Sequence, residues 1–427
     1  MARPTTPKQL SRLILYAVIG AAVLALIYWS PIAFTSEALA VSEAPPAPSI
    51  QAVTDDIKND TLGVQAIFAI NLPSRVDKRD NIMLGASVSG FQIEILDATT
   101  PDQIDPKTYP YNWNHAIHRP IEYAARRSHL NAMQRIIKDH LASAIIMEDD
   151  ADWDVTLKTQ LQSFALSVRT LQSQAPVTNP EADTDADTAA AGNPNPDPNS
   201  NSPYGNNWDI LWLGHCGIEC HPPSTTPYTL TPNDPTVPPP DHFLPYWRDE
   251  PPHSRPPTAR MTCAITDGVC SLVYAVSLRG AQRILAALSV NPSGLAEQID
   301  IGAQFDVSLG RMCGAGYLRC YAPYPALTGG YKAAGSAAKG SDINGPDVEG
   351  EDGDVTEGET EGEGVVVQEP FSHGVMYSTM LNIKRILAGE ETVLATWDDV
   401  PVREIRPGDV GVIEGYVQAP IPPGSQE

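Results

Sequence analysis

The sequence predicts an α/β fold with a mixed central sheet, and three observations indicate it. Short apolar runs typical of buried strands recur along the chain. A helix with one apolar face lies between two of these runs, and another helix directly follows a third run. Alternation of strand and helix is the rhythm of an α/β sheet. With 427 residues, the chain is long enough to bury the core of one large domain.

The elements follow in order along the chain. The predicted strands are residues 64–72, 91–96, 144–147, 208–213 and 271–276. The helix before the third strand has apolar residues on one face, namely Leu130, Met133, Ile137 and Leu141. Ser277 is placed to cap a second helix, whose buried side holds Ala281, Ile284, Leu285 and Leu288. A further helix is expected over residues 375–387.

Three polar segments interrupt this pattern. Residues 176–207 are rich in Asp, Asn and Pro, residues 222–257 are crowded with prolines, and residues 344–370 consist largely of Gly and Glu. Such segments bury too little apolar surface to offset the entropy lost on ordering. We expect all three to be disordered or loosely packed surface insertions.

The charge balance excludes one broad class of partner. The chain has 28 Lys and Arg against 52 Asp and Glu, a net charge of −24. Nucleic-acid binding needs clustered cations to contact phosphates, so no nucleic-acid partner is expected. Nothing in the sequence indicates the oligomeric state.

The N-terminal region predicts a membrane anchor. Residues 13–34 form an apolar run about as long as is needed to cross roughly 30 Å of hydrocarbon. Basic residues precede it and acidic residues follow it, which predicts a single-pass type II protein, expected in the Golgi or ER membrane, with the residues after the anchor in the lumen. A cleaved signal peptide is the alternative. The predicted organisation is a cytosolic tail (1–12), the anchor (13–34), a stem (35–60), the main domain (61–343), an acidic insertion (344–370) and a C-terminal extension (371–427).

The cysteines fit that lumenal location. All six, Cys216, Cys220, Cys263, Cys270, Cys313 and Cys320, lie in the second half of the chain, and disulfides are the default in an oxidising compartment. Close spacing favours the pairs Cys313–Cys320 and Cys263–Cys270, although six cysteines allow about 15 pairings. A zinc site that uses His215 and His221 with the nearby cysteines is the competing interpretation.

An acidic run follows the strand 144–147 and is the strongest candidate for chemistry. Glu148, Asp149, Asp150, Asp152 and Asp154 fall within seven positions. Ligands of open α/β sheets gather at the carboxyl ends of strands, and carboxylates suit Mg²⁺ or Mn²⁺. A solvated acidic turn is the simpler interpretation. We expect the first three to bind a metal and the last two to form a solvated edge.

Other polar residues follow or precede the strands. Asn71, Arg75 and Arg79 come just after the first strand, and arginine presents a planar fork that suits phosphate. Ser128 and His129 lie on the helix before the acidic strand. On their own, these residues are more often ordinary surface or helix residues.

Six motifs in order resemble glycosyltransferase family 25, the lipopolysaccharide-type galactosyltransferases and their eukaryotic relatives, and most of all its fungal members. They are INLPSRVDKRD (70–80), DATTP (97–101), ARRSHLNAM (125–133), IIMEDDADWD (145–154), WDILWLG (208–214) and YAVSLRGAQRIL (274–285). The resemblance spans about half the chain. Residues 121–126 depart from the family's usual Gly-x-x-Gly-Cys stretch, and the long insertions have no counterpart in its short bacterial members.

The resemblance implies a GT-A-like fold with a single nucleotide-sugar-binding domain, Mn²⁺ or Mg²⁺ as cofactor and inverting transfer from a UDP-sugar. Carried over, Asn71, Arg75, Arg79, Ser128 and His129 line the nucleotide-sugar, and Glu148, Asp149 and Asp150 bind the metal. Asp306 resembles the family's downstream catalytic Asp, with Asp300 as second choice. Residues 341–343 resemble its closing Ser-Asp-Ile.

The expected function is therefore transfer of a hexose, commonly galactose, from a UDP-sugar to a glycan or glycoprotein acceptor. A non-catalytic lumenal protein that binds nucleotide-sugar or glycan, or acts as a scaffold, is the alternative of a different class. A metal-dependent phosphohydrolase ranks last, because the sequence lacks the additional His and Asp motifs expected for it.

Overall fold

Alternating apolar residues give the central strands two buried faces. In β1 (Ala66–Asn71), Phe68 and Ile70 face one hydrophobic core, and Ile67 and Ala69 face another. The computed structural model describes residues 53–110, 113–174, 202–243, 253–290, 304–336, 342–343 and 366–419. All of these belong to one unit, Pro48–Glu427.

The central sheet is mixed. Its other strands are β2 (Glu94–Asp97), β3 (Ser143–Glu148), β5 (Ile210–Gly214), β6 (Gly217–Cys220), β7 (Tyr228–Thr231), β8 (Arg260–Val269), β9 (Val273–Ser277), β10 (Cys320–Tyr324) and β17 (Tyr416–Gln418). They run in the order β17-β7-β8-β10-β5-β9-β3-β1-β2, with β6 beside β8. β1 is parallel to β2 and β3, and β10 is parallel to β5, whereas β9 is antiparallel to both of its neighbours.

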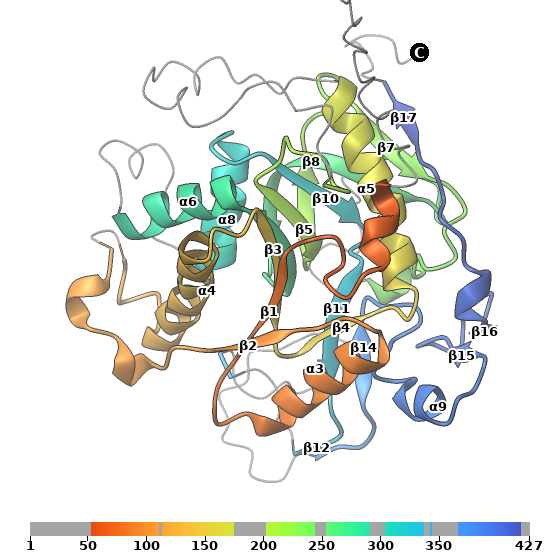
Figure 1. Cartoon of the computed structure of the whole chain (residues 1–427), viewed down its shortest axis with the longest axis horizontal. Coiled ribbons are helices and arrows are strands. Elements are labelled where there is room, and N and C mark those ends of the chain that lie inside the picture. The colour runs from red at the N-terminus through yellow and green to blue at the C-terminus, as the bar shows by residue number, and fades with distance from the viewer. Residues whose placement is uncertain are drawn as a thin grey trace, which may run out of the picture. The chain divides into compact units, whose positions relative to one another are not determined.

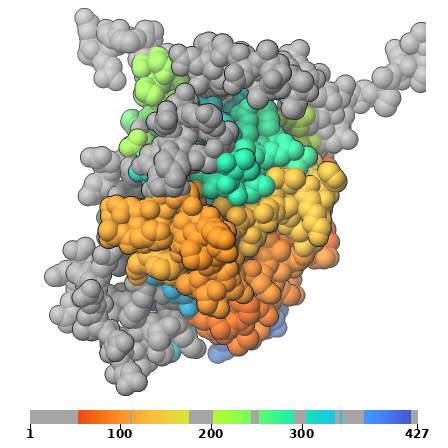
Figure 2. Space-filling view, turned by 90° about the vertical axis from the view of Figure 1, so that its left-hand side faces the viewer, coloured from red at the N-terminus to blue at the C-terminus, as the bar shows by residue number. Residues whose placement is uncertain are grey.

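Helices cover both faces of this sheet (Figure 1). α4 (Pro120–Lys138), α6 (Leu278–Leu285) and α8 (Phe305–Gly314) pack on the core that includes Phe68, and α3 (Val76–Val88) and α5 (Leu157–Gln174) pack on the other. Figure 2 views the first of these sides, where α4 in orange and gold and α6 in green reach the surface. The short helices are η1 (Asp55–Lys58), η2 (Pro101–Gln103), η3 (Pro106–Thr108), η4 (Pro240–His242), the π-helical turn η6 (Ala286–Val290), α9 (Ile383–Leu387) and η8 (Pro407–Asp409).

Three small sheets complete the part of this unit that the structure describes. β4 (Ala151–Trp153), β11 (Thr328–Lys332) and β14 (Phe371–His373) form the first, with β11 in the middle. β12 (Gly335–Ser336) pairs with β13 (Val366–Val367), and β15 (Val393–Leu394) pairs with β16 (Glu404–Ile405). β14 and β17 thus tie the C-terminal residues to the rest of the unit.

Most predicted elements are present. All five predicted strands form, as β1, β2, β3, β5 and β9, and the Ser277 hydroxyl caps α6 by accepting a hydrogen bond from the Gly280 amide at 3.0 Å. The predicted helix over residues 375–387 is wrong for most of its length, since only α9 is helical. The residues before α9 bind buried aspartates instead, for example through the backbone amide of Tyr377.

The prediction that residues 222–257 are a disordered or loosely packed insertion is wrong for β7 and for the buried residues Thr236 and Val237, and the predicted insertion 176–207 is packed at Tyr204, which is 1% exposed. Tyr228 and Leu230 are buried in this strand, and it pairs with β8 on one side and β17 on the other. The reason is that the prolines flank residues 228–231 rather than interrupt them, so every backbone amide of the strand is free to bond.

The predicted fold class needs a second correction, which concerns the membrane helix. In the part of the chain that the structure describes, no helix combines the length and the apolar character needed to span a bilayer. The fold is accordingly an α/β unit with a large mixed sheet. The predicted anchor, residues 13–34, lies outside the described residues.

Three disulfides link the six cysteines. The predicted Cys313–Cys320 pair is confirmed, but the predicted Cys263–Cys270 pair is wrong, because β6 pairs with β8 and brings Cys216 to Cys270 and Cys220 to Cys263. Zinc is excluded there, since both nearby cysteines are oxidised. Three disulfides place the protein in an oxidising compartment, lumenal or extracellular.

Candidate functional site

Three parallel strands end at one edge of the sheet, and each ends in a polar residue. The register pairs Asn71 of β1 with Asp97 of β2, and Ile70 of β1 with Glu148 of β3. β1 and β3 lie side by side (Figure 1), so Asn71 and the acidic residues after β3 are neighbours across the sheet. This is the edge where open α/β sheets bind their ligands.

The acidic loop after β3 surrounds a lysine. Lys78 lies in the first turn of α3, and its Nζ is 3.2 Å from Asp149 Oδ1, 3.6 Å from Asp150 Oδ2 and 3.0 Å from Asp342 Oδ2. Asn71 donates a hydrogen bond to Asp149 at 2.8 Å. The Lys78 side chain is only 10% exposed, so these interactions are shielded from solvent.

The two predicted nucleotide-site arginines extend this cluster. Arg75 binds Asp77 at 2.9 Å and Asp342 at 2.5 Å, and its side chain is 13% exposed. The Arg75 guanidinium lowers the pKa of Asp77 to about 2. Arg79 donates to Asn71 Oδ1 at 3.0 Å and lies 3.8 Å from Asp97. Asn71 thus connects both arginines to the acidic loop, because its amide also donates to the Arg75 carbonyl.

The aspartates of the loop differ in charge preference. Burial raises the pKa of Asp149 to about 6, although Lys78 opposes the shift. Burial acts in the same direction on Asp150, but Lys78 and Lys332 outweigh it and lower its pKa. Lys332 Nζ lies 3.7 Å from Asp150. Asp150 therefore keeps its negative charge more firmly than Asp149.

Glu148 points away from this cluster and belongs to a second one. It accepts a hydrogen bond from the Ser271 hydroxyl at 2.7 Å, and its Oε1 lies 3.7 Å from His129 Nε2. His129 is buried, stacks on Phe305 with ring centroids 4.3 Å apart, and bonds the Tyr274 hydroxyl through Nδ1 at 3.0 Å. The cause of the separation is strand alternation, which sends neighbouring side chains to opposite faces.

Asp306, the predicted catalytic base, lies in the first turn of α8 beside this second cluster. It accepts a hydrogen bond from the Cys270 amide at 2.8 Å. Burial raises its pKa, and the nearby Glu148 charge raises it further. The second-choice base, Asp300, lies outside the described residues. Ser128 has a local role, since its hydroxyl accepts from the Thr99 amide and donates to the Ala124 carbonyl.

The prediction that Asp152 and Asp154 form a solvated edge is wrong. Both are buried, at 0% and 1% exposure. Asp152 accepts hydrogen bonds from the hydroxyls of Ser372 and Ser378, and Asp154 accepts from the Tyr377 amide and from Thr156. The C-terminal residues cover both carboxylates and supply the donors that their burial requires.

The described residues do not fit a conventional metal site. No group of three His, Cys, Asp or Glu side chains in the described ranges converges in a metal-binding arrangement. Asp150 Oδ1 is buried without a hydrogen-bond partner among the described residues, which leaves one available ligand atom. However, the Lys78 ammonium occupies the centre of the cluster, and Glu148 is engaged with Ser271. In this arrangement, the three predicted metal ligands are therefore not available together to a divalent ion.

Sequence reasoning missed Lys78, Ser271 and Tyr274. Lys78 had a usable signal, because a helix that begins right after β1 directs its first turn towards the end of the neighbouring strand. The signal for Ser271 and Tyr274 was weaker, because finding them requires knowing that β9 pairs antiparallel with β3. That pairing places Val273 opposite Met147.

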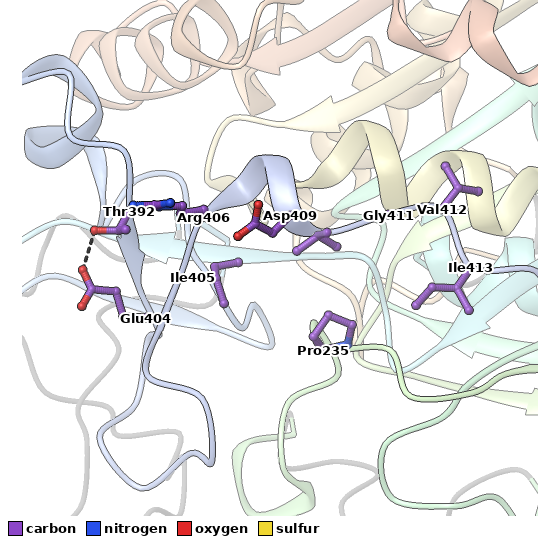
Figure 3. A pocket seen from close by; sticks show the side chains of 10 residues that line it. Pro235, Thr392, Glu404, Ile405, Arg406, Asp409, Gly411, Val412 and Ile413 are labelled. Atoms are coloured by element: carbon purple, nitrogen blue, oxygen red, sulfur yellow. Dashed lines mark hydrogen bonds between the residues drawn. The ribbon is translucent and has the colours of Figure 1, made fainter.

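A larger cavity lies elsewhere. It has a volume of about 750 Å³ and is an open groove between Pro235 and the segment from Glu404 to Ile413 (Figure 3). The cavity at the acidic loop, lined by residues such as Lys78 and Asp150, holds only about 10 Å³. No residue lines both, and the groove contains none of the predicted site residues.

Comparison with known proteins gives no further identification. No family model matches this sequence, and no curated protein matches it.

Proposed function

We propose that the protein is a glycosyltransferase that moves a hexose from a UDP-sugar to a glycan or glycoprotein acceptor. The hexose that we propose is galactose. One observation carries the proposal. Cationic and acidic side chains from α3 and from the loop after β3 meet at the carboxyl edge of three parallel strands, with a separate carboxylate pair, Glu148 and Asp306, nearby. The lumenal or extracellular compartment agrees with a glycan or glycoprotein acceptor.

The donor diphosphate belongs on the Arg75 side of the site. Arginine offers a planar fork of donors that matches phosphate oxygens. In the free protein Arg75 binds the carboxylate of Asp342, and the adjacent cavity of about 10 Å³ has room for about one water molecule. The donor diphosphate therefore competes with Asp342 for Arg75, and the Asp342 side chain moves away when the donor binds.

The second cluster supplies the base. In an inverting transfer, a carboxylate takes the proton of the acceptor hydroxyl while that oxygen bonds to the anomeric carbon and the bond to UDP breaks. Asp306 suits this role, since burial raises its pKa and makes it a stronger base than an exposed aspartate. His129 and Ser271 orient Glu148 beside it.

The test is release of UDP by the purified protein from a panel of UDP-hexoses with glycan acceptors. Asp306→Asn should lower kcat by about 10²-fold or more, because the acceptor proton loses its base. Asp56→Asn, at an exposed aspartate of η1, is the matched control and should leave kcat unchanged. Equal UDP release by wild type and the Asp306 variant would contradict the assigned base, and no release from any donor would contradict the function.

The groove favours one other function, that of a binding protein. Its volume of about 750 Å³ is in the range of small-molecule sites, and it lies apart from the acidic loop. Saturable glycan binding that Arg406→Gln weakens, without UDP release on any acceptor, would favour this second function.

A further inference from the structure

A lysine occupies the position where the sequence predicts a divalent cation. Lys78 Nζ lies 3.0 to 3.6 Å from one oxygen each of Asp149, Asp150 and Asp342. These aspartates come from two separate parts of the chain, and α3 supplies the lysine. The Lys78 side chain is 10% exposed, and those of Asp149 and Asp150 are 11% and 16% exposed.

We propose that the Lys78 ammonium is the resident cation of this acidic cluster. In the proposed transfer reaction, Lys78 and Arg75 then meet the donor diphosphate directly, without a divalent ion. This second part rests on the proposed glycosyltransferase function, whereas the first part concerns only the protein.

The distances suit an ammonium ion. Mg²⁺ holds its oxygen ligands at about 2.0–2.1 Å, whereas N–H···O contacts of a lysine lie near 2.7–3.2 Å. Two of the three Lys78 contacts fall in or at the end of the lysine range, and the third is longer. A divalent ion at this position would need the carboxylates to move inwards and the ammonium to leave.

The charges around Lys78 already balance. Three carboxylates, those of Asp149, Asp150 and Asp342, face three cations, those of Lys78, Lys332 and Arg75. Asp77, the other partner of Arg75, is 35% exposed and so is partly solvated. A divalent ion would have to displace the Lys78 ammonium from its carboxylate partners. The site has little solvent to replace those contacts, and breaking a buried ion pair costs free energy. Among the described residues, the buried carboxylates of the cluster are therefore matched in number by cations, which weakens the attraction of the site for a divalent ion.

The Lys78→Met variant should gain the ability to bind a divalent ion. Methionine has a similar length but no charge, so the variant has two adjacent aspartates without their central cation. Asp150 Oδ1, which has no hydrogen-bond partner among the described residues, is then available as a ligand. We expect the variant to bind Mn²⁺ where the wild type does not.

The experiment is a Mn²⁺ titration of the full chain, followed by the electron paramagnetic resonance signal of free Mn²⁺. Wild type and Lys58→Met should show no saturable binding, since Lys58 is an exposed lysine that pairs with Asp55. Lys78→Met should bind one Mn²⁺ saturably, with a Kd at least about tenfold below the highest Mn²⁺ concentration at which the wild type shows no binding. Adding Asp150→Asn to Lys78→Met should abolish that gain.

The Mn²⁺ titration of the wild type tests whether Lys78 is the resident cation even if Lys78→Met fails to fold. Saturable binding of one Mn²⁺ by wild type that Asp150→Asn removes would overturn the proposal. Lys78→Arg, which keeps the charge, should behave as wild type.

Binding of UDP separates the two proposals. UDP binding that persists in EDTA and weakens in Lys78→Met supports both. UDP binding that requires Mn²⁺ overturns the role of Lys78 but leaves the glycosyltransferase standing. A protein that binds no UDP, while Lys78→Met gains Mn²⁺ binding, supports Lys78 as the resident cation and contradicts the glycosyltransferase.

Discussion

Neighbouring carboxylates at the end of β3 have opposite protonation preferences. The pKa of Asp149 is raised to about 6 by burial, whereas that of Asp150 is lowered by two lysines. Asp149 shares Lys78 with other carboxylates and has one amide from Asn71 to compensate its charge. Stability at mildly acidic pH should therefore depend on Asp149.

The expected pH dependence follows from the direction of that shift. Between pH 3.8, the ordinary pKa of an aspartate, and about pH 6, the folded protein keeps the Asp149 proton that the unfolded chain has lost. The free energy of unfolding should therefore fall as pH rises through this window, by roughly 2–3 kcal/mol on account of Asp149. Asp154, whose pKa burial also raises to about 6, acts in the same direction.

Urea unfolding of wild type and Asp149→Asn at about pH 4, 5 and 6 measures how the free energy of unfolding depends on pH. The variant should show a shallower fall because the contribution of Asp149 is gone while that of Asp154 remains. Asp56→Asn, at an exposed position, should match the wild type. A slope unchanged by Asp149→Asn would show that another group binds the proton.

At the scale of elements, Asp152 of β4 holds the C-terminal residues on the unit. Its carboxylate accepts hydrogen bonds from Ser372 in β14 and from Ser378, and it is fully buried. β14 itself pairs with β11, which also pairs with β4. The Thr379 amide also donates to the Trp153 carbonyl at 2.9 Å, so the segment from residue 371 to 380 is tied to β4 through both backbone and side-chain bonds.

Asp152→Ala should lower the free energy of unfolding by about 2–4 kcal/mol, because two buried hydroxyls lose their acceptor. It should also speed proteolysis near residues 371–380. Asp398→Ala is the control, since Asp398 is 88% exposed and pairs with Arg403 at the surface. If the two variants had equal stability, the buried network would contribute no more than a surface pair.

The disulfides should differ in their contribution to stability. Cys220–Cys263 joins residues 43 apart, whereas Cys313–Cys320 joins residues only 7 apart. Closing the longer loop removes more entropy from the unfolded chain, so replacing both of its cysteines with serine should cost about 4 kcal/mol, against about 2 kcal/mol for the shorter loop. Urea unfolding of the two double variants compares them, and a larger loss for the short loop would contradict the assignment of loop entropy.

Local patterns predicted the elements more successfully than the contacts between them. The apolar runs located β1, β3 and β9, because each is buried on two faces and reads as continuous apolar sequence. β7 escaped prediction, because its four residues lie among prolines. The cross-strand cysteine pairs escaped as well, since they depend on the register of β6 against β8, which sequence spacing does not encode.

The candidate site was predictable to the same extent. Asn71 and Asp149 could be placed together because parallel neighbours end at the same edge. The burial of Asp152 and Asp154 could not, because the covering residues lie more than 200 positions further along the chain. Glu148 separates from Asp149 by simple strand alternation, yet the partners that give it a role, Ser271 and His129, come from distant segments.

At the scale of the whole molecule, the described residues offer two places for a ligand. One is the polar edge, by which we mean the cluster of Asn71, Arg75, Lys78 and Asp149 at the ends of β1 and β3 and the start of α3. The other is the groove along residues 404–413. Each has an arginine that can report on it, Arg75 at the edge and Arg406 in the groove. Arg406 is 60% exposed and pairs with Glu391 at 3.4 Å, so its replacement should disturb little.

The most direct test is therefore calorimetric titration of UDP into wild type, Arg75→Gln and Arg406→Gln. If the polar edge binds the nucleotide of a sugar donor, wild type binds UDP, Arg75→Gln binds it at least about tenfold more weakly, and Arg406→Gln binds it like wild type. Loss of UDP binding in Arg406→Gln alone, or no binding by wild type, would contradict the glycosyltransferase site proposed at the ends of β1 and β3.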